Sequence, residues 1–436
     1  MRPGRRRSVA RRPDGLGAGS HVTQTAPPTA AEYSREQRRA LRVIVVSQVL
    51  GGAGMAAGIT VGALLAEDLL GSTSLAGLPA ALFTIGAALG AAVLGRVCQR
   101  FGRRPGLALG NAVAALGSAG VVAGAAARWP VLLLTALFVY GAGTVTGLLA
   151  RYAGADLAPP ERRGRASGTV LFAMTLGAVA GPNLIGPTGS LADAWGLPRL
   201  TGPFLLAVAA YTAAALVLLV WLRPDPLLLT QPRETGAAVA GPGSGPHGPG
   251  RAAPGVITGA TVMITAQLVM ITVMTMTPVH MTAHGHGTQA VGLVIALHVG
   301  AMFLPSPLSG LLADRIGGRR VGAAAGVVLL GAGLSAALAP PASTALLACA
   351  LVLLGVGWNL ALLGGTALIT DAAPAENRAA VQGMADVGMS VAGATGGMVS
   401  GLVVGGSGYP TLATAAGALA LAVIPAVALS NGRRRG

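Results

Sequence analysis

Long apolar stretches separated by short polar ones follow one another from residue 41 almost to the end of this chain. A helix that crosses a lipid bilayer needs about 20 predominantly apolar residues. Stretches of this kind lie at residues 41–66, 73–95, 106–127, 131–152, 167–190, 201–222, 255–282, 288–312, 321–339, 343–366, 379–404 and 410–430. The pattern predicts an all-α membrane protein with twelve transmembrane helices in two six-helix halves.

The segment between the halves is rich in Pro and Gly and cannot form a packed core. The N-terminal segment is basic and lacks the apolar core of a signal peptide, so we expect a disordered tail. The predicted organisation is a tail (1–40), an N-terminal six-helix bundle (41–222), a linker (223–254), a C-terminal six-helix bundle (255–431) and a short tail (432–436).

Composition and charge place the chain in a membrane and orient it. Charged residues make up 10% of the chain, against about 25% in soluble domains. The net charge of +16 does not indicate nucleic-acid binding, because the arginines lie in the tails and in short loops. They follow the even-numbered stretches, whereas the opposite loops carry only Arg128 and Arg199. Because cytoplasmic loops are rich in Arg, we predict a multi-pass protein of a bacterial-type plasma membrane with both termini and the linker in the cytoplasm.

The expected function class is transport rather than catalysis. Two helical repeats joined by a linker are typical of secondary transporters. The chain has no phosphate-binding GxxxxGK[ST] loop, so we expect no ATP, and we expect no cofactor and no enzyme activity.

A repeated motif follows the second and eighth stretches. The chain reads GRVCQRFGRRP at 95–105 and GLLADRIGGRR at 310–320. Both resemble the signature G-x-L-A-D-R-x-G-R-R of the major facilitator superfamily, which implies the major facilitator fold. The first copy has Gln99 in place of the usual Asp, and the second keeps Asp314. The resemblance implies a conformational latch of the outward-facing state near the start of the fifth stretch, at Ser167. The candidate latch residues are Asp314, Arg315, Arg319, Gln99 and Arg100.

Few ionisable residues lie inside the apolar stretches, where they are costly and often functional. Asp386 lies about two turns into the eleventh stretch, where it either takes part in proton coupling or pairs with an arginine near its helix end. Arg151 lies near a helix end, and we expect it to extend towards the membrane surface.

Methionine and histidine are concentrated in the seventh and eighth stretches. Met270 and Met274 are four residues apart near the middle of one, and His298 and Met302 have the same spacing in the other. A short loop joins the two stretches, so antiparallel neighbours would bring the pairs to one cavity. Thioether and imidazole together suit Cu(I), although methionine is also a common filler of apolar helices. Further candidate ligands towards the entrance are Met263, Met276, His280, Met281, His284 and His286.

A narrower resemblance concerns these two pairs. M-x-x-x-M at 270–274 and H-x-x-x-M at 298–302, followed by Phe303-Leu304-Pro305-Ser306, resemble the motifs of the CcoA-like copper importers. The resemblance implies import of Cu(I) by alternating access, with Met270, Met274, His298 and Met302 as ligands, and release to a cytoplasmic copper acceptor. The alternatives are a permease or exporter of a small organic molecule or drug on the same fold, and a membrane receptor for metal. The aromatic content of 3% disfavours a drug exporter.

Overall fold

The computed structural model describes residues 30–70, 78–230 and 253–432. Most of the predicted tails and linker (1–29, 231–252 and 433–436) lies outside these residues. The first half contains α1 (Ala30–Leu70), α2 (Leu78–Phe101), α3 (Arg103–Ala126), α4 (Pro130–Thr144), α5 (Thr146–Ala155), η2 (Pro160–Arg162), α6 (Arg163–Asn183), α7 (Ile185–Ala194), η3 (Arg199–Thr201), α8 (Gly202–Trp221) and α9 (Pro226–Thr230). The second half contains α10 (Pro254–Ala283), α11 (Thr288–Phe303), α12 (Ser306–Ile316), α13 (Gly318–Leu338), α14 (Thr344–Ala372), α15 (Arg378–Ala420) and α16 (Val423–Gly432).

Each predicted stretch coincides with a helical rod, so the predicted all-α fold is confirmed. Three rods consist of two helices end to end: α4 with α5, α6 with α7, and α11 with α12. Conversely, α15 contains two rods, because Gly408 has a left-handed φ of 81° just before Pro410. Within the described residues, 9 helical segments are long and apolar enough to cross a membrane. The last of these spans both rods of α15, and α1 and α6–α7 complete the predicted set.

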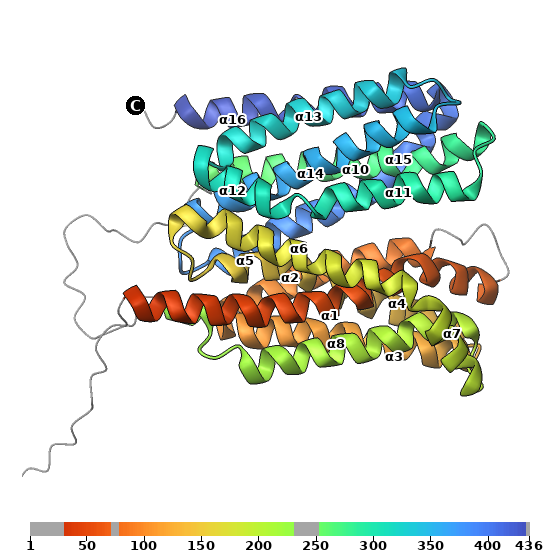
Figure 1. Ribbon diagram of the computed structural model, residues 1–436, viewed down its shortest axis with the longest axis horizontal. Coiled ribbons are helices and arrows are strands. Elements are labelled where there is room, and N and C mark those ends of the chain that lie inside the picture. The colour runs from red at the N-terminus through yellow and green to blue at the C-terminus, as the bar shows by residue number, and fades with distance from the viewer. Residues whose placement is uncertain (1–29, 71–77, 231–252, 433–436) are drawn as a thin grey trace, which may run out of the picture.

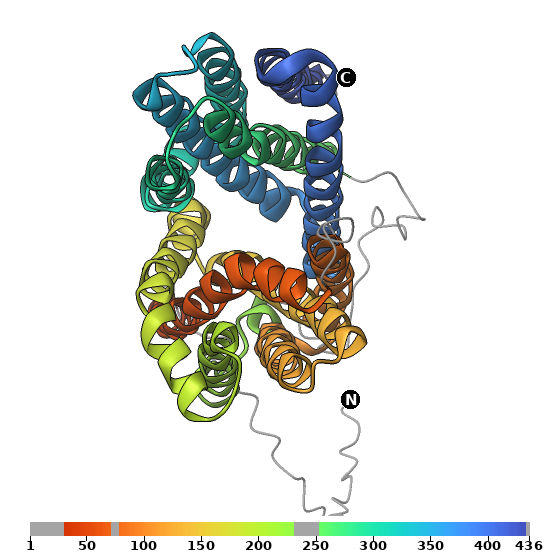
Figure 2. The same ribbon diagram turned by 90° about the vertical axis from the view of Figure 1, so that its right-hand side faces the viewer.

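The two halves form two bundles that lie side by side (Figure 1). They meet along two seams, where α2 packs against α15 and α6 packs against α12. Figure 2 shows these seams on opposite sides of the molecule, orange beside blue and yellow beside teal. Residues with no room for a side chain mark the α6–α12 seam: a Cβ atom at Gly310 would collide with the carbonyl group of Gly164. At one end of the molecule, the helix backbones of the two halves are therefore in direct contact across the seams.

We call this the arginine-rich end, because it carries the loops that follow α2, α5, α12 and α14. It lies on the left in Figure 1, where α1 begins and α16 ends.

The expected pairing of the seventh and eighth rods is wrong in one respect. α10 and α11 touch only slightly, and α14 packs extensively against both. Gly355 of α14 lies so close to α11 that an added Cβ would collide with the carbonyl oxygen of His298. A Cβ added at Gly365 of α14 would likewise collide with the side chain of Met263 in α10. A short connecting loop therefore does not make α10 and α11 packing partners, because a later helix fills the space between them.

Candidate functional site

Asp314 lies at the end of α12 and contacts the first turn of α6 in the other half. Its Oδ1 accepts the backbone N–H of Gly164 at 2.6 Å, and its Oδ2 accepts that of Arg165 at 2.9 Å. A helix N-terminus carries free N–H groups and partial positive charge, which stabilise a carboxylate. The contact thus lies two to three residues before the expected position at Ser167. Both hydrogen bonds to the Asp314 carboxylate come from the backbone of α6. Of the two arginines expected beside it, Arg315 is exposed and Arg319 is half-buried.

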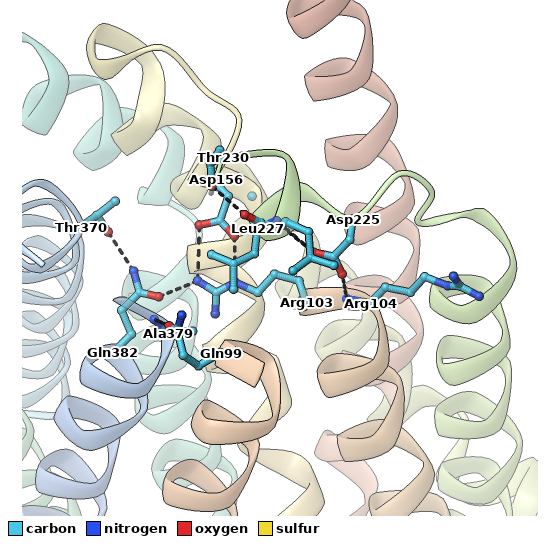
Figure 3. A network of polar contacts seen from close by, with 12 residues as sticks. Gln99, Arg103, Arg104, Asp156, Asp225, Leu227, Thr230, Thr370, Ala379 and Gln382 are labelled. Atoms are coloured by element: carbon cyan, nitrogen blue, oxygen red, sulfur yellow. Dashed lines mark hydrogen bonds and ion pairs between the residues drawn. The ribbon is translucent and has the colours of Figure 1, made fainter. Parts of the chain in front are cut away.

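Gln99 makes the matching contact between α2 and α15. Its Oε1 accepts the backbone N–H of Ala379 at 2.7 Å (Figure 3). Its Nε2 donates to the carbonyl oxygen of Ala375 at 3.4 Å. Arg100 is exposed and lies over the ring of Phe101, away from this contact. The two motif copies therefore join the halves in the same way, but only the Asp314 contact involves a charge.

A buried cluster around Arg103 adds a third connection between the halves. The Arg103 guanidinium donates two hydrogen bonds to Asp156, at 2.8 and 3.3 Å, and one to Oε1 of Gln382 in α15, at 2.6 Å (Figure 3). Gln382 in turn donates to Thr370 of α14. The sequence analysis missed Asp156 and Gln382, because residues 53 and 279 positions from Arg103 give no local signal.

The start of the predicted linker is ordered against the first motif copy. Asp225 accepts the backbone N–H of Arg104 at 2.7 Å and that of Leu227 at 2.9 Å (Figure 3). Gly102 has a φ of 98°, and a Cβ there would collide with the Asp225 carboxylate. The motif glycine is therefore required both by its backbone conformation and by its contact with Asp225.

An ion pair between Arg151 and Asp386 joins the halves more deeply. The Nη2 of Arg151 in α5 lies 2.6 Å from Oδ1 of Asp386 in α15, and both side chains are buried. Arg151 also donates to Thr366 of α14 at 2.9 Å and to the Tyr152 hydroxyl at 2.8 Å. The expectation that Arg151 extends towards the membrane surface is wrong, because the other half supplies its counter-charge. Of the two alternatives for Asp386, pairing with an arginine is observed, and a part in coupling stays a prediction.

His298 is buried, with one ring nitrogen bonded and the other without a partner. Its Nδ1 lies 2.8 Å from the carbonyl oxygen of Leu351 and must donate to it, which leaves Nε2 as an acceptor. That Nε2 is buried and has no hydrogen-bond partner among the residues that the structure describes. Metal-binding histidines are commonly held in this way.

The three methionines among the predicted copper ligands belong to one hydrophobic core. Met270 and Met302 are buried in it and Met274 packs against it. Within the described ranges there is no group of three or more His, Cys, Asp or Glu that could hold a metal. Any metal at His298 would therefore depend on thioether ligands.

The candidate ligands towards the entrance separate into three groups. Met263 and Met281 are buried in the core, and Met276 is partly buried and packs against it. His286 uses both ring nitrogens, at 2.7 Å from the Pro341 carbonyl oxygen and 3.0 Å from the Thr344 hydroxyl. His280 and His284 lie together, with ring centroids 4.3 Å apart.

A small pocket lies within the first half. It is lined by Gln48, Gly51, Gly52, Met55, Asn111, Thr144, Gly147, Met174 and Tyr211. The amide nitrogens of Gln48 and Asn111 donate to backbone carbonyl groups. The lining combines neutral hydrogen-bonding groups with an aromatic ring and thioethers, and its described residues include no carboxylate, imidazole or guanidinium.

Comparison with known proteins identifies the family. The family model described as "Major Facilitator Superfamily" matches residues 44–361 and 258–435. The chain belongs to the major facilitator superfamily. This facilitator is thus a multi-pass secondary transporter, as predicted.

Relatives of this facilitator cover nearly its whole length. It is 48% identical over 396 residues to the uncharacterized MFS-type transporter YddS of Bacillus subtilis, which covers 89% of this chain and 90% of the relative. It is 30% identical over 393 residues to the riboflavin transporter RfnT of Brucella anthropi, covering 86% and 91%. The crystal structure of the human organic anion transporter MFSD10 has the same fold, with a TM-score of 0.69, 17% identity, and coverage of 90% and 99%. None of these relatives is described as a copper importer.

Proposed function

We propose that this facilitator moves a small organic solute across the membrane by alternating access. The relationship to a riboflavin transporter, 30% identical over nearly the whole chain, carries the proposal. The pocket in the first half supports it: in this state the pocket has room for about one water molecule, and its neutral amide, hydroxyl and aromatic groups would contact a polar organic solute once it widens. We therefore prefer transport of a small organic molecule, the alternative given in the sequence analysis, to copper import.

The gate of this cycle is the set of contacts at the arginine-rich end. Asp314 with α6, Gln99 with α15, and Arg103 with Gln382 each cross between the halves. If this end is cytoplasmic, as the arginine distribution predicts, the structure corresponds to a state closed to the cytoplasm. Opening the gate requires all three contacts to break together.

Asp386 is our candidate for the coupling residue. When the halves part, the Asp386 carboxylate and the Arg151 guanidinium lose their partner across the seam. Leaving one member of a buried ion pair alone costs about 3–5 kcal/mol. A proton taken up by Asp386 removes its charge and lowers this barrier, which would link the gate to a proton gradient.

Cu(I) transport is the second candidate. The unpartnered Nε2 of buried His298 favours it, together with Met270 and Met302 in the same core. The intervening α14 weakens it, because α10 and α11, which carry the two motifs, touch only slightly.

A ligand screen on the purified protein separates the two. The melting temperature is measured with a panel of vitamins, nucleobases and organic acids, with riboflavin as the first probe, and with Cu(I) under reducing conditions. We expect an organic compound to stabilise the wild type and His298→Leu alike, and Asn111→Leu much less. Stabilisation by Cu(I) alone, lost in His298→Leu, would contradict the proposal.

A further inference from the structure

His280 lies in the last turn of α10 and His284 directly follows the last residue of this helix, at the end of the molecule opposite the arginine-rich end. The four-residue spacing places the two side chains next to each other. Their ring centroids are 4.3 Å apart with an angle of 52° between the planes. His280 is half-buried and His284 exposed, so water and ions reach the pair.

The surroundings of the pair hold the rings in place while leaving nitrogen lone pairs for a ligand. The Nδ1 of His284 lies 2.8 Å from the carbonyl oxygen of His280 and donates to it, so its Nε2 carries a lone pair. The ring of His280 stacks on Tyr409, with centroids 4.3 Å apart and planes 14° from parallel. The Tyr409 hydroxyl is itself fixed by Thr277 at 2.8 Å. Such outer contacts orient metal-binding histidines.

We propose that His280 and His284 bind one borderline divalent cation, such as Zn²⁺, Cu²⁺ or Ni²⁺, with water completing the coordination. Imidazole is a preferred ligand of these ions, and two histidines four residues apart on a helix are a known arrangement for binding zinc. The site differs from the buried Cu(I) candidate, because it has two accessible imidazoles and no thioether. It does not depend on what the facilitator transports.

Its position suggests a regulatory consequence. Tyr409 follows the kink of α15 at Gly408, so a metal on His280 would stiffen the contact between α10 and the start of the last rod. A cation bound there would slow any movement in which these ends separate.

His286 provides a matched control. It lies two residues from His284, yet both of its nitrogens are used by Pro341 and Thr344. Its removal should therefore leave the cation site intact.

The test is Zn²⁺ binding to the full-length protein, purified in detergent through a tag without histidine, in competition with a chromophoric zinc indicator. We expect the wild type, His286→Ala and His298→Leu to bind one Zn²⁺ with the same affinity, and His280→Ala and His284→Ala to bind at least tenfold more weakly. Size-exclusion profiles and melting temperatures without metal establish that each variant is folded. Wild-type affinity in His284→Ala would overturn the proposal, as would an equal loss in His286→Ala or His298→Leu.

Discussion

The guanidinium of Arg151 and the carboxylate of Asp386 form a buried ion pair, 2.6 Å long, that joins the two halves of the transporter. Neither partner has a counter-charge within its own half among the contacts seen here, so each half holds an ion that the other half neutralises. Separation of the halves at this point therefore carries an electrostatic cost that the protein must meet in every cycle.

The first prediction concerns this pair. Asp386→Leu and Arg151→Leu should each lower the free energy of unfolding by about 3–5 kcal/mol, because each leaves a buried charge alone. The double variant should recover much of the loss. The measurement is the melting temperature of the four purified proteins in one detergent. Strictly additive losses would show that the two residues act separately.

The second prediction compares the two motif contacts. Asp314→Asn removes a charge that α6 stabilises by about 0.3–1 kcal/mol when exposed, and more when buried. It should weaken the closed gate and increase protease cleavage at the arginine-rich end. Gln99→Glu introduces the missing charge at the matching place and should strengthen the gate. If Asp314→Asn leaves transport and protease cleavage unchanged while Gln99→Ala abolishes transport, the Gln99 contact is the stronger of the two and the prediction is wrong.

The third prediction uses the close approach of α6 and α12. Gly310→Ala places a Cβ against the backbone of Gly164, so it should disfavour the closed gate. Gly331→Ala in α13 is the control, because its Cβ would face open space. Crosslinking between cysteines placed on α6 and α12 measures closure. Equal crosslinking in the two variants would mean that the seam tolerates the added group.

The fourth prediction is the orientation. Gly245→Cys in the linker should react with a membrane-impermeant thiol reagent only after the cells are permeabilised. Ala342→Cys, in the exposed turn between α13 and α14, should react from outside. Cys349 is exposed and must first be replaced, whereas Cys98 is buried. The opposite labelling pattern would show that the molecule has the reverse orientation in the membrane.

How far the sequence predicted the structure depended on the range of each interaction. Apolar length located the rods, because a bilayer imposes it locally. The repeated motif pointed to the contact of Asp314 with the start of α6, although Gln99 lacked the expected charge. Arg151 was misjudged because its place near a helix end says nothing about the helix of the other half that covers it.

The candidate site was harder to predict for the same reason. The spacing of Met270–Met274 and His298–Met302 is local, but the position of α14 between their helices is not. The pocket around Asn111 draws on several rods that are distant in sequence, and none of its residues has a motif of its own.

The most direct test of the central claim is a paired uptake assay in proteoliposomes. One set receives the radiolabelled organic solute that best stabilises the purified protein, and the other receives radiolabelled copper under reducing conditions. We predict saturable uptake of the organic solute by the wild type and His298→Leu, its loss in Asn111→Leu, and copper uptake no greater than in empty liposomes. Saturable copper uptake that disappears in His298→Leu, Met270→Leu, Met274→Leu and Met302→Leu would contradict the account.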